Sequence, residues 1–304
     1  MNFTLIANNI QSTLPSPIEI GHGYRIRLAT EQEWVFIKLY CDKQIESYSF
    51  GIRNPFEMKR QGNAFLNLAR DEYKYWVIEH DRNQIPNEHI SIFALLNKSI
   101  YPIYSFQQQG QTTNYSCSMP GFSYSRIQEF SHNFWPTEFE QTDIKLLNQL
   151  FEAFDNLNAE RHNFIINAIE DYRTLFHIPF HSNLKTIGYM SLIEKIITSR
   201  KSLQINSINF QLQNKLNLIN NRSDNRIDLL SRTNPTDKTN SQKVIELLYS
   251  YRSNIAHGEI SDFDDKLQIL GDEFEANSLI KDLCKMTIIQ SIFEPDLLID
   301  LRTC

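Results

Sequence analysis

An arginine and a histidine, Arg252 and His257, stand close together near the C-terminal end of the chain. Arginine keeps its charge at physiological pH, and its planar guanidinium can donate to two phosphate oxygens at once. Histidine titrates near neutral pH, so its imidazole can accept or donate a proton during a reaction. A charged clamp beside a proton carrier is suited to the cleavage of a phosphodiester. We therefore take these two as the candidate catalytic residues.

The segment before the pair is expected to form an amphipathic helix over residues 241–257. Apolar side chains recur there at helical spacing and would form its buried face: Val244, Leu247, Leu248 and Tyr251. Gly258 can end this helix in the left-handed conformation, which would put His257 at the negative end of the helix dipole. That position favours the protonated imidazole, and the nearby Arg252 opposes it. Alternatively, the two side chains only cap the last carbonyls of the helix.

The spacing of an arginine and a histidine is not diagnostic by itself. Similar spacings occur at Arg82 and His89 and at Arg126 and His132. No amphipathic run leads into either of those pairs. The helical context therefore singles out Arg252 and His257.

The run Leu248–Gly258 resembles the signature of HEPN domains. It is most similar to the Apea-like branch, in which a Tyr or Leu stripe precedes Arg-Ser-x-x-x-His-Gly. An upstream run, Gly188–Ile197, is similar to the earlier helix of the family, which often carries a glutamate at the place of Glu194. The resemblance covers roughly residues 140–295, about half of the chain. Ser253 differs from the Asn, Asp or His that many HEPN nucleases have after the arginine, but the Apea-like branch tolerates serine there.

The resemblance implies a metal-independent endoribonuclease. In this chemistry the RNA's own 2′-hydroxyl attacks the adjacent phosphate and leaves a 2′,3′-cyclic phosphate and a 5′-hydroxyl. His257 would move protons and Arg252 would stabilise the transition state, with Ser253, Asn254 and Glu194 as auxiliary or substrate-positioning residues. No cofactor or metal ion is expected, because the nucleophile belongs to the substrate.

The resemblance also suggests partners. Domains of this kind typically pair so that two Arg/His sets face one cleft, so we expect a homodimer through the helical domain acting on RNA. Related proteins often act in bacterial defence against phage or in toxin-like systems, with residues 1–136 as a sensor that binds a trigger or regulator. The alternatives are a non-catalytic HEPN module that binds RNA or a partner protein, and a plain dimerisation domain.

The expected fold class is α+β, with a mixed α/β domain over residues 1–136 and an all-α HEPN helical bundle over residues 137–304. In the first domain, Tyr24–Leu28 alternates apolar and polar residues as a half-buried strand does, and Thr30–Glu33 fits a capping box. Further strands are expected at residues 73–78, 90–96 and 100–106. In the second domain, a long helix over residues 142–176 is followed by helices at 183–200, 207–231, 241–257 and 272–292.

Composition limits the other possibilities. The chain has 304 residues, 41% of them hydrophobic, and no apolar stretch long enough to span a membrane or act as a secretory signal, so we expect a cytoplasmic protein. The four cysteines are scattered, which suggests neither a disulfide framework nor a zinc site. His177 and His181 have helical metal-ligand spacing, but Pro179 between them breaks that geometry.

The charge distribution offers two interpretations. The net charge of −6 arises in residues 137–304, because acidic and basic residues balance in residues 1–136. Basic residues dominate from Lys195 to Arg252, and acidic residues dominate after His257. Either the basic run guides RNA towards Arg252, or both runs are ordinary solvated helix faces.

Overall fold

The structure, a computed structural model, describes residues 2–48, 57–61, 64–69, 72–82, 85–96, 100–108, 115–118, 137–179, 182–199 and 207–303. The chain forms two compact units, Met1–Glu152 and Ala153–Cys304. The first contains an antiparallel sheet with helices and the second is all-helical, which confirms the α+β class.

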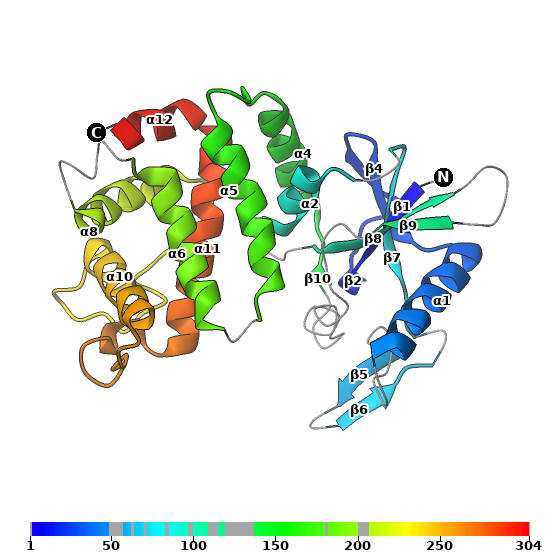
Figure 1. Cartoon of the computed structure of the whole chain (residues 1–304), viewed down its shortest axis with the longest axis horizontal. Helices are drawn as coiled ribbons and strands as arrows, with labels where there is room; N and C mark the ends of the chain where they lie inside the picture. The colour runs from blue at the N-terminus through cyan, green and yellow to red at the C-terminus, as the bar shows by residue number, and fades with distance from the viewer. Residues whose placement is uncertain are drawn as a thin grey trace. The chain divides into compact units, whose positions relative to one another are not determined.

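The main sheet of the first unit has six antiparallel strands in the order β3-β4-β7-β1-β8-β9 (Figure 1). Its strands are β1 (Asn2–Ile6), β3 (Ile18–Gly21), β4 (Tyr24–Leu28), β7 (Trp76–His80), β8 (Pro102–Gln108) and β9 (Tyr115–Ser118). Two smaller two-stranded sheets pair β2 (Ile10–Gln11) with β10 (Thr137–Glu138) and β5 (Met58–Gln61) with β6 (Ala64–Asn67). The predicted strand at Tyr24–Leu28 is confirmed: Tyr24 and Ile26 are buried and Arg25 is exposed.

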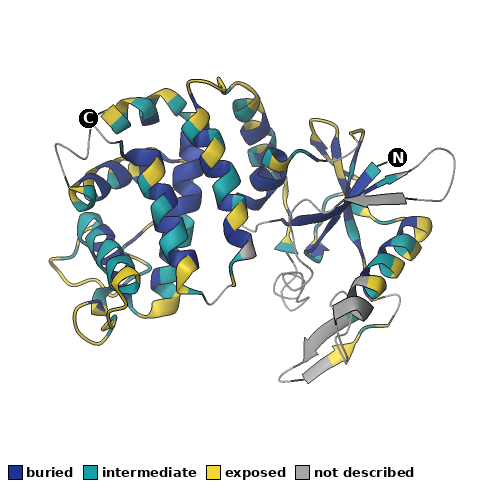
Figure 2. Ribbon diagram, viewed as in Figure 1, coloured by how far each residue is buried: buried dark blue, intermediate teal, exposed yellow. Residues whose placement is uncertain are grey.

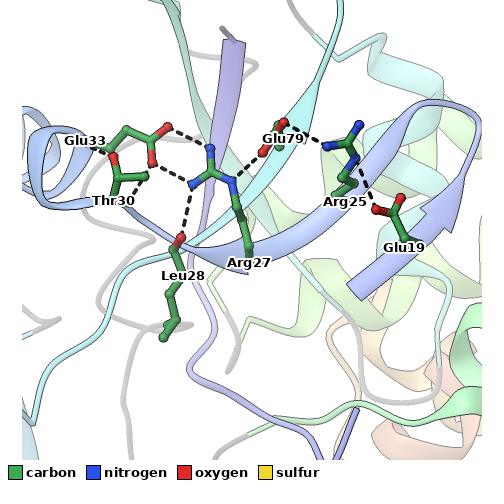
Figure 3. Close-up of polar contacts among 7 residues, drawn as sticks. All are labelled: Glu19, Arg25, Arg27, Leu28, Thr30, Glu33 and Glu79. Atoms are coloured by element: carbon green, nitrogen blue, oxygen red, sulfur yellow. Dashed lines mark hydrogen bonds and ion pairs between the residues drawn. The ribbon is translucent and has the colours of Figure 1, made fainter. Parts of the chain in front are cut away.

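Helix α1 (Glu31–Tyr48) begins with the predicted capping box. The Glu33 amide donates to Thr30 Oγ1 at 3.3 Å, and the Thr30 amide donates to Glu33 Oε2 at 2.8 Å. Arg27 donates to both oxygens of Glu33, at 2.7 and 2.8 Å, and its Nε donates to Glu79 (Figure 3). Burial acts to raise the pKa of Glu33, but the Arg27 and Thr30 hydrogen bonds outweigh it and hold that pKa below its usual range. These contacts tie the start of α1 to strands β4 and β7.

Of residues 90–96, predicted as a strand, residues 90–94 belong instead to helix α2 (Asn87–Ala94), and residues 95–96 form the turn that follows it. Six consecutive residues of this helix, from His89 to Ala94, are buried. A short segment that is buried on all sides shows no period, so the apolar run could not distinguish a strand from a helix. Pro86 directly before the first helical residue fits a helix start.

A chain of hydrogen bonds crosses the core of the sheet. His80 is 2% exposed; its Nδ1 lies 2.7 Å from the Arg82 carbonyl and its Nε2 lies 3.0 Å from Thr4 Oγ1. Since a carbonyl can only accept, Nδ1 carries the proton and Nε2 accepts from Thr4, which in turn accepts from Ser105 Oγ at 2.7 Å. This arrangement fits a neutral imidazole. Burial lowers the pKa of His80, although the Arg82 carbonyl acts in the opposite direction.

We expect His80 to make the protein acid-sensitive. An unfolded histidine has a pKa of about 6.5, and the folded value is lower, so below about pH 6.5 the unfolded state binds a proton that the folded state does not. The free energy of unfolding should therefore fall as pH drops from about 6.5, by up to about 1.4 kcal/mol per pH unit. Denaturant unfolding at pH 7.0, 6.0 and 5.0 measures this loss.

The matched comparison uses the pH slope and not the absolute stability. His80→Gln should show a shallower slope between pH 7.0 and 5.0 than the wild type, because it has no imidazole to protonate. Equal slopes for wild type and His80→Gln would contradict the prediction.

Helix α4 (Gln141–Asp155) contains the division between the units, which falls after Glu152. The reason lies in its apolar face: Phe151 lies 5.6 Å from the rings of Tyr24 and Phe93 in the first unit. The predicted domain boundary between residues 136 and 137 stays a prediction, and residue 136 lies outside the described residues.

The second unit is built from helices α5 (Asn163–Thr174), α6 (Asn183–Ile197), α8 (Ile208–Gln211), α9 (Asn217–Arg222), α10 (Ser241–His257), α11 (Glu273–Phe293) and α12 (Pro295–Thr303). It also contains the short 3₁₀ helices η2 (Leu175–His177) and η4 (Gln268–Leu270), and the π-helix η3 (Leu212–Leu216), which joins α8 to α9. Helix α11 packs against α5, α6, α9 and α12 and is buried along most of its length (Figure 2). No helix among the described residues is long and apolar enough to cross a membrane.

Two predicted helices of the second half are shorter than expected. The helix over 142–176 is interrupted between α4 and α5, where Asn158 Oδ1 accepts the amides of Glu160 and Arg161 at 3.0 and 2.9 Å. The helix predicted to reach residue 231 ends at Arg222, and the Asn220 side chain bonds both backbone groups of Ile227 instead. Asparagine side chains that bind nearby backbone compete with the helix.

Candidate active site at the end of helix α10

Helix α10 has the predicted bounds, and its start explains why. The Asn240 side chain caps it by accepting the Lys243 amide at 2.8 Å. The face predicted to be apolar is buried: Val244, Leu247, Leu248 and Tyr251. The cap therefore fixes where the helix begins, and burial of the apolar residues fixes which face of the helix packs against the core.

The end of the helix is also as predicted. Gly258 has φ 69° and ψ 23°, in the left-handed region. Its amide donates to the Ile255 carbonyl at 3.2 Å, and the Glu259 amide donates to the Asn254 carbonyl at 2.8 Å, as in a Schellman motif. Because a Cβ at Gly258 would meet nothing within 4 Å, the backbone angle and not the available space requires glycine here. His257 is the last residue of the helix and is exposed.

Arg252 faces helix α6. Its Nη2 lies 3.5 Å from Glu194 Oε1, and the two side chains are only 21% and 16% exposed. Arg252 Nε and Glu194 Oε1 are buried and make no hydrogen bond to the residues that the structure describes. The pair thus holds a donor and an acceptor that are shielded from solvent and left unsatisfied by the described residues.

Burial shapes the protonation of this pair. It raises the pKa of the Glu194 carboxyl above its usual range, and the Arg252 charge acts in the opposite direction without overcoming it. A carboxyl with a raised pKa takes up a proton more readily when the positive charge beside it is engaged elsewhere. Binding of an anion to Arg252 would therefore favour protonation of the Glu194 carboxyl.

The structure brings two of the five predicted site residues into direct contact. Arg252 and Glu194 meet, whereas Ser253 and Asn254 are half-buried and their side chains make no hydrogen bond within the described ranges. His257 follows Arg252 by five helical residues, so the two side chains start about 140° apart around the axis and about 7.5 Å apart along it. Within one chain, the guanidinium and the imidazole therefore leave the helix in different directions.

Sequence reasoning placed Tyr251 on the buried face of α10 and also considered it for a dimer contact, but the structure buries it to 1% exposure and gives its hydroxyl polar partners within the chain. Its hydroxyl lies 3.2 Å from both Glu273 Oε1 and Asn277 Oδ1, and Thr186 Oγ1 donates to the same Asn277 oxygen at 2.6 Å. Burial, and then the Glu273 charge, raises the pKa of Tyr251. The hydroxyl therefore links α10 to α11, and through Asn277 to Thr186 of α6. A tyrosine at an otherwise apolar position of the helix was the signal in the sequence.

The other pairs with similar spacing are not comparable sites. His89 is 4% exposed, and its Nδ1 lies 2.6 Å from the Tyr24 hydroxyl inside the first unit. Arg126 and His132 lie outside the described residues, as do His181 and the side chain of His177. Within the part of the chain that is described, no group of three or more His, Cys, Asp or Glu side chains could hold a metal ion.

Much of the basic run between Lys195 and Arg252 is paired with acidic side chains. Four ion pairs account for this: Lys195–Asp171 at 2.5 Å, Arg222–Glu294 at 2.5 Å, Arg232–Asp282 at 2.6 Å and Lys243–Glu246 at 2.9 Å. These basic residues present less free charge to a polyanion than their number suggests, which favours the interpretation as solvated helix faces.

Comparisons with protein-family models, curated proteins and solved structures found no match for the chain. Its functional interpretation therefore depends on the residues of α10 and α6 and on their geometry.

Proposed function

We propose that the chain is a metal-independent endoribonuclease of the HEPN type, with Arg252 and His257 as its catalytic residues. The observation that carries the proposal is the arrangement around Arg252. Its guanidinium is held near Glu194 with Nε still unbonded, on a helix whose capped end presents His257 to solvent. An arginine needed only for folding would be expected to have its donors satisfied.

The reaction needs little from the protein. The 2′-oxygen of the RNA forms a bond to phosphorus while the bond from phosphorus to the 5′-oxygen of the next nucleotide breaks. One proton leaves the 2′-hydroxyl and one reaches the departing 5′-oxygen, and His257 supplies one of these transfers. Arg252 stabilises the charge that builds on the non-bridging phosphate oxygens.

Glu194 has a supporting role in this proposal. Its carboxylate lies 3.5 Å from Nη2 of Arg252 and so limits the rotation of the guanidinium that would bind the phosphate. The wider role that we propose is in bacterial defence or a toxin-like system, with residues 1–136 binding a trigger that controls the helical unit.

We expect cleavage to survive chelation, because the nucleophile belongs to the substrate and proton transfer and charge stabilisation come from side chains. The purified protein is incubated with total RNA in EDTA, and the ends of the products are analysed. Fragments with 2′,3′-cyclic phosphate and 5′-hydroxyl ends are the expected result. Strict dependence on Mg²⁺ with 5′-phosphate ends would contradict the mechanism, and RNA binding without cleavage would favour a non-catalytic binding module.

We also expect the active form to be a homodimer. In-line transfer needs an acid and a base on opposite sides of the phosphate, and one chain offers a single imidazole at the end of α10. A two-fold interface would bring the Arg252 and His257 of a second chain to the same phosphate. Two exposed apolar side chains close in sequence to this helix end and to the start of α11 suit such a contact: Ile260 is 92% exposed and Phe274 is 64% exposed.

Sedimentation velocity at the assay concentration tests the dimer. Wild type should sediment as a dimer, and Ile260→Glu should shift it towards monomer and lower the cleavage rate in parallel. Lys266→Glu is the matched control, because it adds a carboxylate at another exposed position of the same loop. A fully active monomer would contradict the prediction.

A further inference from the structure

Tyr249 lies beside the guanidinium of Arg252. The Arg252 Cζ is 5.9 Å from the centroid of the Tyr249 ring, within the range of a cation–π contact. Positions three apart on a helix are neighbours, so the ring and the guanidinium project from the same side of α10. With Glu194 near Nη2, the guanidinium has a carboxylate and an aromatic ring as its two neighbours on the protein.

Two tyrosines on this helix, Tyr249 and Tyr251, differ in their burial and in their contacts with the rest of the fold. Tyr251 is 1% exposed, its hydroxyl contacts Glu273 and Asn277, and its ring packs edge-on against Phe263 at 5.3 Å. Tyr249 is half-exposed, and its hydroxyl makes no hydrogen bond to any residue that the structure describes. Contacts within the fold therefore account for a tyrosine at position 251. They do not account for the partly exposed ring and the unbonded hydroxyl of Tyr249.

We propose that Tyr249 is the platform on which a nucleobase next to the scissile phosphate stacks. This inference rests on the proposed function, since it needs Arg252 to bind that phosphate. A base is tied to its phosphate through a single ribose, so a base that flanks a phosphate held by Arg252 lies within reach of a ring beside that guanidinium. Aromatic side chains stack on any base, because every base has a π-face.

The platform defines a class of substrate. A base in a duplex is already stacked and paired, whereas a base in a loop, bulge or single strand is free to leave its neighbours. Tyr249 therefore selects unpaired RNA, with little preference for sequence. The ring also restricts the guanidinium from one side, which places Tyr249 as a positioning residue for Arg252.

Binding to an RNA that cannot be cleaved tests the platform apart from catalysis. Once wild-type protein has defined a cleavage site, a short single-stranded oligonucleotide is made with a 2′-deoxy sugar there, and its Kd is measured by fluorescence anisotropy. Tyr249→Leu should weaken binding by about 5- to 150-fold, the range of one base–aromatic stack. Tyr249→Phe keeps the ring and should bind within about twofold of wild type.

Removing the base provides the decisive comparison. Two further oligonucleotides carry an abasic nucleotide on one or the other side of the scissile phosphate. On one of them, wild type and Tyr249→Leu should bind equally, because the stacking partner is gone. Tyr251→Phe is the control: any loss that it causes should be the same with and without the base.

The outcomes separate this inference from the proposed function. If wild type cleaves and binds but Tyr249→Leu keeps its Kd, or loses the same factor on all three oligonucleotides, the platform is refuted and the nuclease remains. If wild type neither cleaves nor binds RNA, the proposed function fails and the platform fails with it.

Discussion

Replacing His257 with alanine is expected to lower the rate of RNA cleavage by about 10²- to 10⁴-fold, the usual contribution of a general acid or base. The fold should not change, because His257 is exposed and the cap that follows it is made by the backbone of Gly258 and Glu259. Initial rates on one defined RNA, together with thermal unfolding of wild type and variant, measure both effects.

The control for His257→Ala is Glu259→Ala, a truncation at the same exposed end of α10 that leaves the cap amides in place. It should cleave at close to the wild-type rate. If His257→Ala also cleaves at the wild-type rate, the imidazole has no part in the reaction. If it unfolds several degrees below wild type, the side chain has a structural role instead.

Local sequence patterns were enough to predict the element that carries the site. The bounds of α10 follow from an N-cap asparagine, an apolar stripe and a glycine in the left-handed region, all within one short segment. Glu194 was reached only through a family resemblance, because its contact with Arg252 depends on how α6 packs against α10. No spacing within a single helix contains that information.

Elements whose identity depends on tertiary packing were harder to predict. Residues 90–94 of the expected strand belong to helix α2, and the prediction was wrong because burial on all sides removes the periodicity that distinguishes a helix from a strand. The link from Tyr251 to Glu273 and Asn277 joins residues far apart in sequence, and so could not be inferred from the tyrosine alone. In both cases the prediction would have required knowing which elements of the fold pack against each other.

Replacing Arg252 with lysine should abolish most cleavage while preserving the fold. An ammonium retains the charge beside Glu194 but cannot present two parallel donors to a phosphate, and the loss of such a transition-state donor costs about 10²- to 10³-fold in rate. The free energy of unfolding of Arg252→Lys should stay within about 1 kcal/mol of wild type, because the half-buried carboxylate keeps a partner. Wild-type cleavage by this variant would instead indicate that Arg252 only attracts RNA by its charge.

A second pair of variants separates the structural part of the contact from the catalytic part. Arg252→Met leaves the Glu194 carboxylate, which is 16% exposed, without its countercharge and should destabilise the protein by about 1–3 kcal/mol, less than for a fully buried pair. Adding Glu194→Gln removes the stranded charge and should recover most of that stability, as denaturant unfolding would show. The double variant should nevertheless remain inactive, because neither methionine nor glutamine can neutralise charge on a phosphate. Recovery of cleavage together with stability would mean that Arg252 serves the fold and not the reaction.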